Sequence, residues 1–396
     1  MKTILDWWGE SCDLQCDEEP SGAKLRKATC APAISNVIYH EQPFCSADGS
    51  RIAVFRTHDA RRWMPGEMLV YDINRYALAS LLPGAGGQGY VATDAWSGVL
   101  FVAAVANGAT RLNQEDDPLN SSRTVWRVDL NTLKCRELPF ACGDLGAVSA
   151  SSQHGLFSHA IGEIQSDGRQ EFGIFQIDLE SGDTELIYRS CDICNPHLQY
   201  RRGLADRILI QENRDWRYNA QGIFGPSAES TVGLCSIATD GSDRREFPIG
   251  GDYTPPTTGH ECWIGESDRA LVTLNAPHDD GERSGCVLEV CHDWQAPRVV
   301  FDSPAHWNHI AASRCGKYFV ADCYDTPETP LLVGNIDTGK TAVLCHARAE
   351  GGGAQHTHAH PYFTSNNQWV VFNSDRTGIT QIYLARVPDG FLQSLD

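Results

Sequence analysis

The stretch PYFTSNNQWVVFNSDRTGITQIYLARVPDGF, residues 361–391, consists of short apolar runs separated by polar turns. Ser, Asn, Asp and Gly fill the turns, which is typical of antiparallel strands joined by tight connections. The same order of runs and turns recurs upstream, as in IAASRCGKYFVAD (310–322) followed by LLVGNIDTGKTAVLC (331–345). The chain is therefore predicted to repeat one small antiparallel unit.

Seven such units can be aligned along the chain, the third being the weakest, around SASSQHGLFSHA (149–160). Each unit contains a hairpin with a polar turn and a second hairpin with an acidic turn, over roughly 45–55 residues, the size of a propeller blade. The predicted fold is all-β, a seven-bladed β-propeller forming one domain over residues 1–396. Its four-stranded blades are expected within residues 40–392.

The seventh unit ends before its fourth strand. DEEPSGAKLRKAT, starting at Asp17, resembles the turn and outer strand of other units, such as DLESGDTELIY (178–188). We expect residues 17–30 to complete the last blade and so close the ring, which would cover strand edges that otherwise invite aggregation.

Composition limits the possible partners. With 32 basic and 51 acidic residues, the 396-residue chain has a formal charge of −19, which disfavours nucleic acid and anionic membranes. No apolar stretch has the length of a membrane span, and the N-terminus lacks the apolar region of a signal peptide. Fifteen cysteines, an odd number, then predict free thiols in the cytoplasm, and CDIC (191–194) has no second CxxC to complete a zinc site. We expect a monomer.

Histidines gather at one position of the repeat, just before the first strand of a unit. His306 competes with His309 for this position, and the hairpin alignment favours His309. A polar plug at the mouth of the channel is the plainer explanation, but a shared site on the axis accounts better for imidazoles from five blades. The six histidines at this position are His40, His197, His260, His309, His358 and His360.

The segment GGGAQHTHAHPYF (351–363) contains three alternating histidines. If it is fully extended, His356, His358 and His360 share one face, and a divalent cation would remove the cost of holding imidazoles together. A kink after the glycines would instead turn Gln355 inward in place of His356. The residue pattern leaves both arrangements open.

These motifs resemble those of the oligogalacturonate lyases, propeller-fold polysaccharide lyases that degrade pectin-derived oligouronides. QHTHAHPYF (355–363) is the most specific, and the resemblance is strongest from residue 193 onward. One departure is QENRDWRYN (211–219), where the family usually has a Cys-His-Glu-Gly-Pro-like run. The supporting motifs are NPHLQYR (195–201), GHECW (259–263), NHIAASRCGKYFVAD (308–322) and HEQPF (40–44).

The resemblance implies roles for particular residues. His260 would be the Brønsted base, and the family also has an arginine near the active site, for which Arg217 and Arg214 are both available. We assign Arg217 to catalysis and Arg214, His197 and Arg201 to substrate binding. The family pattern prefers Gln355 to His356. The metal ligands, for manganese in the family, would be His309, Gln355, His358 and His360.

The implied activity is β-elimination from a uronide, in which a cation neutralises the carboxylate beside the proton that is removed. We therefore predict a metal-dependent lyase that acts on oligogalacturonides or related oligouronides. A lyase for a different uronide is an alternative, motivated by the QENRDWRYN departure. A second alternative is a non-catalytic binding platform like the TolB-type propellers, which SDRTGITQIYLA (374–385) also resembles.

Overall fold

The protein is all-β in the computed structural model, as the sequence predicts. Two short 3-10 helices, η1 (Gln355–Thr357) and η2 (Gln393–Leu395), are the only helices in the described part of the chain. None of the helices there is long and apolar enough to cross a membrane. The structure describes residues 5–10, 19–39, 41–58, 66–85, 91–104, 124–141, 147–149, 153–226, 230–254, 259–277, 283–326, 328–350 and 355–396.

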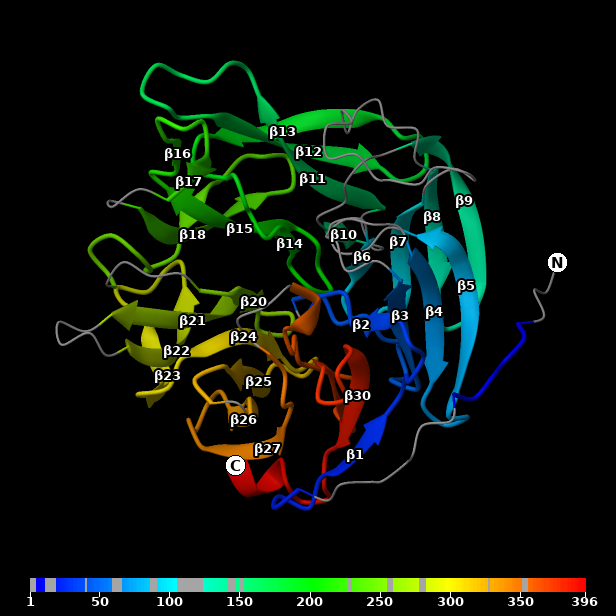
Figure 1. Ribbon diagram of the computed structural model, residues 1–396. Coiled ribbons are helices and arrows are strands. Elements are labelled where there is room, and N and C mark those ends of the chain that lie inside the picture. The colour runs from blue at the N-terminus through cyan, green and yellow to red at the C-terminus, as the bar shows by residue number, and fades with distance from the viewer. Residues whose placement is uncertain are drawn as a thin grey trace.

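The strands form antiparallel sheets arranged around a common centre (Figure 1). The first sheet has eight strands: β2 (Ile34–Asn36), β3 (Arg51–Thr57), β4 (Gly66–Asp72), β5 (Ala77–Ala85), β6 (Val91–Asp94), β7 (Val99–Ala104), β8 (Thr124–Asp129) and β9 (Lys134–Ala141). A four-stranded sheet follows: β10 (Ala147–Ser149), β11 (His154–Ile161), β12 (Glu171–Asp178) and β13 (Thr184–Ser190). The next has β14 (Gln199–Tyr200), β15 (Arg207–Arg214), β18 (Thr231–Ala238) and β19 (Arg245–Glu246), with a separate hairpin of β16 (Arg217–Tyr218) and β17 (Phe224–Gly225).

Three more four-stranded sheets complete the set. One contains β20 (Glu261–Trp263), β21 (Arg269–Pro277), β22 (Arg283–Cys291) and β23 (Arg298–Ser303). Another contains β24 (Trp307–Ala312), β25 (Tyr318–Cys323), β26 (Pro330–Asn335) and β27 (Thr341–His346). The last combines the two ends of the chain: β28 (Tyr362–Phe363), β29 (Trp369–Ser374), β30 (Gln381–Arg386) and β1 (Lys24–Lys27).

The N-terminal strand β1 lies along β30. The two strands pair antiparallel, with Lys24 opposite Arg386 and Lys27 opposite Tyr383. In Figure 1 the blue β1 arrow runs beside the red β30. A strand from the start of the chain therefore supplies the outer edge of a sheet built mostly from its end.

Turns with a carboxylate or amide cap join the third and fourth strands of several sheets. Asp72, for example, accepts hydrogen bonds from the backbone N–H groups of Asn74 and Arg75. Such Asx turns satisfy backbone donors locally, which explains why acidic residues recur at this place in the sequence. Equivalent turns are made by Asp129, Asp178 and Asn335.

The apolar cores lie between consecutive sheets, because the middle strands bury side chains on both faces. β25, for instance, is buried along its whole length. One core cluster joins three sheets: the eight-stranded sheet, the sheet of β24–β27 and the sheet that combines the two ends of the chain. It contains Val54 of β3, Val333 of β26 and Val371 of β29. This packing fixes the inner ends of the sheets, where the loops that precede β14, β20, β24 and β28 converge.

Candidate metal centre and active site

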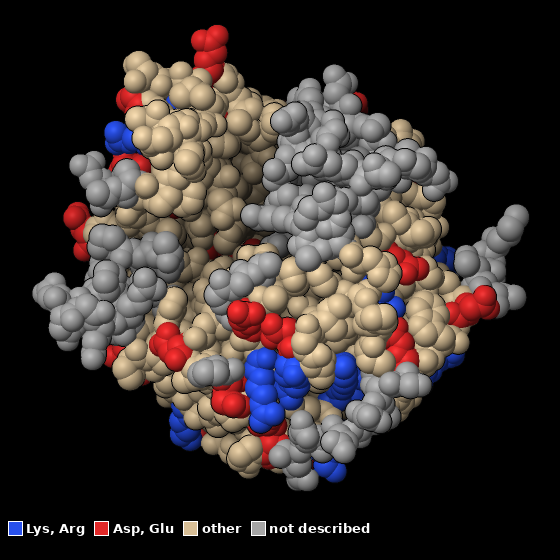
Figure 2. Space-filling view, viewed as in Figure 1, with Lys and Arg blue, Asp and Glu red and all other residues tan. Residues whose placement is uncertain are grey.

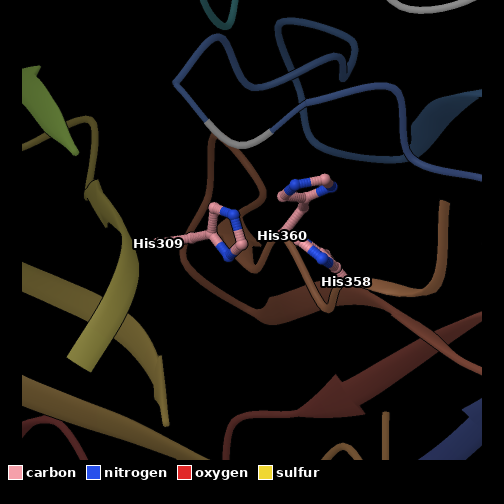
Figure 3. Close-up of side chains that lie close together, drawn as sticks. All are labelled: His309, His358 and His360. Atoms are coloured by element: carbon pink, nitrogen blue, oxygen red, sulfur yellow. The ribbon is translucent and has the colours of Figure 1, made fainter. Parts of the chain in front are cut away.

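Three histidines from two neighbouring sheets converge on one point. His309 extends from β24, whereas His358 and His360 come from the loop between η1 and β28 (Figure 3). Their ligand atoms all lie within 4.8 Å of one another. The ring of His309 is 4.2 Å from that of His360 and 5.4 Å from that of His358, measured between centroids.

Asp322 on β25 orients His309. Its Oδ1 accepts a hydrogen bond from the His309 backbone N–H, and its Oδ2 lies 2.9 Å from His309 Nδ1. The hydroxyl of Tyr324 donates to the same carboxylate and accepts from the backbone N–H of Ala359, between the other two histidines. A carboxylate bonded to Nδ1 leaves Nε2 of His309 for a metal, an arrangement common around metal-bound histidines.

Gln355, rather than His356, lies against this cluster. Residues 355–357 form the 3-10 turn η1 instead of an extended strand, so the two-residue alternation of side chains does not apply. The side-chain Nε2 of Gln355 is 3.0 Å from Nε2 of His360, and turning the amide over would present its oxygen there. His356 is half-buried and is not part of the three-histidine group.

The donor set fits a divalent metal. Burial lowers the pKa values of both His309 and His360 well below the ordinary range, and neighbouring imidazoles lower them further. Both rings are therefore neutral near pH 7, as metal ligation requires. Three imidazoles and one amide suit manganese, zinc or iron and carry no charge of their own.

His260 lies directly beside the cluster, one residue before β20. Its ring centroid is 4.5 Å from that of His309. Its backbone N–H donates to Oγ1 of Thr273 and its carbonyl accepts from the Thr273 N–H, so β21 fixes the residue. Burial lowers the pKa of His260 well below its ordinary value, and the neighbouring imidazoles of His309 and His197 act in the same direction. The side chain is thus a neutral imidazole, able to accept a proton.

His197 is stacked on His260 and lies between two buried carboxylates. The two rings are 5.8 Å apart and nearly parallel. Nδ1 of His197 is 2.8 Å from Oε1 of Glu41 and 3.3 Å from Oε1 of Glu261. Burial alone would lower the pKa of His197, but the charges of Glu41 and Glu261 outweigh burial and raise it well above its ordinary value.

The ring of Tyr39 lies beside four of the imidazoles, those of His197, His260, His309 and His360. Its ring centroid is 4.9 Å from that of His360 and 6.1 Å from that of His197. The preceding residue, Ile38, has a φ of 69°, an unusual conformation for a β-branched side chain. Backbone strain of this kind is concentrated at functional sites, where it places a neighbouring side chain.

The three arginines singled out from the sequence each contact an acidic residue nearby in the chain. Nη2 of Arg214 is 2.7 Å from Oε2 of Glu212. Arg217 forms a similar pair with Asp215 (3.0 Å), and Nε of Arg201 donates to Oδ1 of Asp206 (2.7 Å). None of their described contacts is with the histidines, and His40 lies outside the described residues.

Five site residues were not found from the sequence: Tyr39, Glu41, Glu261, Asp322 and Tyr324. Glu41 and Glu261 each follow a histidine of the repeat position, and this adjacency could have marked them as site residues. Asp322 is the penultimate residue of the apolar strand β25, and Tyr324 follows the end of that strand. Strand patterning gives no sign that either turns toward an imidazole.

The comparisons with known proteins point in one direction. No family model matches the chain. It is 22% identical to the oligogalacturonate lyase of Dickeya dadantii over 94% of this chain and 95% of that protein. A solved oligogalacturonate lyase in complex with manganese superposes with a TM-score of 0.69 at 18% identity, covering 98% of this chain and 97% of the other.

The chain is similar to oligogalacturonate lyases in both sequence and fold. An oligogalacturonide lyase of Pectobacterium atrosepticum is 26% identical over 47% of the chain, a match that spans about half (53%) of that relative. The β-propeller domain of a Pyrococcus furiosus protease superposes less well, with a TM-score of 0.51 at 11% identity over 87% of this chain and 94% of that one. The all-β, multi-sheet architecture is thus that of oligogalacturonate lyases and propellers, which confirms the resemblance found in the motifs.

Proposed function

We propose that this protein is a metal-dependent lyase that cleaves oligogalacturonides, or closely related oligouronides, by β-elimination. The observation that carries the proposal is the three-histidine cluster with a fourth, neutral histidine beside it: the ring centroid of His260 is 4.5 Å from that of His309. The similarity to oligogalacturonate lyases over nearly the whole chain supports the choice of substrate. A binding platform has no use for such a group of imidazoles.

His309, His358, His360 and Gln355 are the proposed ligands of manganese or a similar divalent metal. When bound, such a cation neutralises the uronate carboxylate and stabilises the negative charge that develops beside it. Asp322 and Tyr324 hold His309 and the backbone of residues 358–360 in place for this task. The neutral ligands leave the cation its full charge. The site can therefore attract an anionic substrate locally, although the chain as a whole has a net charge of −19.

His260 is the proposed base. It takes the proton from C5 of the uronide, and the electron pair forms the C4–C5 double bond. The bond from C4 to the glycosidic oxygen breaks, and that oxygen takes up a proton. A positioned neutral imidazole contributes about 10²–10⁴-fold to such a step. The hydrogen bonds to Thr273 keep the backbone of His260 fixed beside the cluster.

Arg217 remains our proposed catalytic arginine, and Arg214, Arg201 and His197 remain proposed substrate contacts. Their ion pairs with acidic neighbours would have to rearrange when a uronate binds. Arg217 and Arg214 have side chains 38% and 29% exposed, so they are accessible for such a rearrangement. Arginine suits the task because its planar group binds carboxylates through two hydrogen bonds.

A direct assay tests the function. The purified protein, loaded with Mn²⁺, is incubated with digalacturonate and trigalacturonate, and the conjugated product is followed by its ultraviolet absorbance. We expect product formation that stops on adding a chelator and returns with Mn²⁺. Activity on another uronide alone would favour the second lyase specificity, whereas no turnover on any oligouronide would favour a binding platform.

We also propose that the sheets form a closed ring of seven blades in one domain. The eight-stranded sheet supports this count, because among the described residues a single strand pair, Ala85 with Ala104, joins its half β2–β5 to its half β6–β9. With the five four-stranded sheets, the two halves make seven. Closure is supported by the pairing of β1 with β30 and by the core shared between β3 and β29.

If β1 closes the ring, Leu25→Ala is expected to destabilise the whole protein. Leu25 is 3% exposed and belongs to the shared core, so its truncation should lower the free energy of unfolding by about 2–5 kcal/mol. Lys24→Ala, on the exposed side of the same strand, should change it by less than about 0.5 kcal/mol. Chemical denaturation of both variants measures the difference, and equal stabilities would refute a structural role for β1.

A cytoplasmic monomer acting on imported fragments completes the proposal. The twelve cysteines within the described ranges are free thiols, which suits a reducing compartment. Cys191 and Cys194 contact Gln165 and Asn213 and belong to none of the metal-ligating groups of the described residues. Cell fractionation and light scattering test the two statements.

A further inference from the structure

A second group of possible metal ligands lies beside His260. It consists of Glu41, His197 and Glu261, whose side chains are 5%, 13% and 1% exposed. Glu41 follows the β2 segment, His197 precedes β14 and Glu261 begins β20. Three separate sheets therefore direct one nitrogen and two carboxylate oxygens to the same buried point.

The contacts within this group are incompletely satisfied. Nδ1 of His197 lies 2.8 Å and 3.3 Å from the two Oε1 atoms, but these three atoms have no hydrogen-bond partner of suitable geometry among the described residues. A protonated Nδ1 has a single hydrogen, which can serve one carboxylate only. Burying a charged oxygen without a partner is costly, so the arrangement calls for something that binds all three atoms.

The other ring nitrogen of His197 and the second carboxylate oxygen of Glu261 are held by neutral neighbours. Nδ2 of Asn195 is 2.8 Å from Nε2 of His197, and in the opposite amide orientation Oδ1 would accept a hydrogen bond from the N–H at that nitrogen. In the amide orientation that satisfies its own neighbours, Gln211 donates to Oε2 of Glu261 at 2.9 Å. Hydrogen bonds of this kind orient metal-binding histidines and carboxylates. They leave Nδ1 and the two Oε1 atoms facing one another.

We propose that Glu41, His197 and Glu261 form a second divalent-cation site, next to His260 and distinct from the three-histidine cluster. Contacts near 3 Å between the donor atoms match the separation of adjacent ligands around a metal whose bonds are about 2.0–2.2 Å long. Two carboxylate oxygens and an imidazole suit Mn²⁺, Zn²⁺ or Fe²⁺. Two carboxylates against one cation also leave the group neutral.

Such a site would have a use in the proposed reaction, and this part of the inference rests on the proposed function. An oligouronide carries a carboxylate on every sugar, whereas the three-histidine cluster serves one of them. The arginines expected to bind a second carboxylate already contact Asp206, Glu212 and Asp215. A cation held by Glu41, His197 and Glu261 provides a positive group for that second carboxylate.

Metal counting with Mn²⁺ alone tests the site without any substrate. The full-length protein is saturated with Mn²⁺, freed of unbound metal, and analysed by mass spectrometry for metal per chain. We expect two ions in the unmodified protein and one in Glu261→Gln or Glu41→Gln. The exposed Glu266→Gln serves as the matched control and should keep both ions. Thermal unfolding with Mn²⁺ present checks that each variant is folded.

A saturated count of one ion in the unmodified protein overturns the second site, and His197 is then an imidazolium shared by the two carboxylates. A count of two that persists in both Glu variants overturns it as well, because the second ion then binds elsewhere. The result is separate from the proposed function. Two bound ions without elimination would contradict the lyase proposal but support the second cation site. One bound ion with elimination would support the lyase proposal and contradict the second site.

Discussion

Replacing His358 by alanine is expected to lower the metal content by one ion per chain and to reduce elimination by about 10³-fold or more. His358 is one of three imidazoles whose ligand atoms lie within 4.8 Å of one another. Its removal leaves two imidazoles and an amide, too few to hold a divalent ion firmly. A bound cation contributes several kcal/mol of transition-state stabilisation, and each 1.36 kcal/mol is about tenfold in rate. Metal analysis and the absorbance assay give the two numbers.

His356→Ala is the matched control. His356 is the same residue type two positions away, but it lies on η1 outside the three-histidine group. We expect metal content and rate within about twofold of the unmodified protein, since the substitution removes no ligand. If both variants lost the metal, the extended-strand interpretation, in which His356 and His358 are both ligands, would be correct. If neither variant lost metal, the cluster would not be the metal centre.

Much of the fold could be predicted because strand periodicity and turn chemistry are local properties of the sequence. The acidic turns align with Asx turns such as those of Asp72 and Asp178. The extent of β1 was less predictable. Residues 17–30 were expected to supply a turn and an outer strand, and within this range β1 covers Lys24–Lys27. The strand begins opposite Arg386, where β30 ends, so its start depends on the length of a partner strand that residues 17–30 do not encode.

The histidines of the site were predictable because the repeat itself brings them together. Inner strands of different sheets begin at the same end of the molecule, and Figure 2 shows that face hollowed toward its middle. Equivalent positions in different repeats are therefore close in space. His260 and His309, separated by 49 positions in the sequence, have ring centroids 4.5 Å apart for this reason.

The residues that support the histidines could not be predicted in the same way. The choice between Gln355 and His356 depends on a 3-10 turn, which strand alternation does not describe. Asp322 is fully buried near the end of the apolar strand β25, so its approach to Nδ1 of His309 depends on tertiary packing alone. Burial raises the pKa of Asp322 to about 7. A carboxyl group can be buried in this way only because His309 and Tyr324 form hydrogen bonds with it.

Replacing His260 by asparagine is expected to reduce kcat by about 10²–10⁴-fold while metal content stays unchanged. Asparagine keeps a polar side chain of similar reach but cannot accept a proton at neutral pH. His260 contacts His309 through its ring, and Thr273 anchors its backbone rather than its side chain, so the metal ligands keep their positions without the imidazole. KM should change little, because a base acts on the transition state more than on substrate binding. Steady-state kinetics and metal analysis on the same preparation measure both effects.

His154→Asn controls for the loss of any one imidazole and should leave kcat unchanged. His154 is 36% exposed and lies on β11, in a sheet that supplies none of the site residues named above. Loss of turnover with the metal still bound is expected of a base such as His260. For a metal ligand such as His358, turnover and bound metal are lost together. If His260→Asn also lost the metal, the residue would act as a ligand or as a support for His309. If it kept both metal and turnover, another group would remove the C5 proton. His197, stacked on His260 at 5.8 Å, is a poor substitute, because its Nδ1 faces Glu41 and Glu261, whose charges raise its pKa well above the ordinary value.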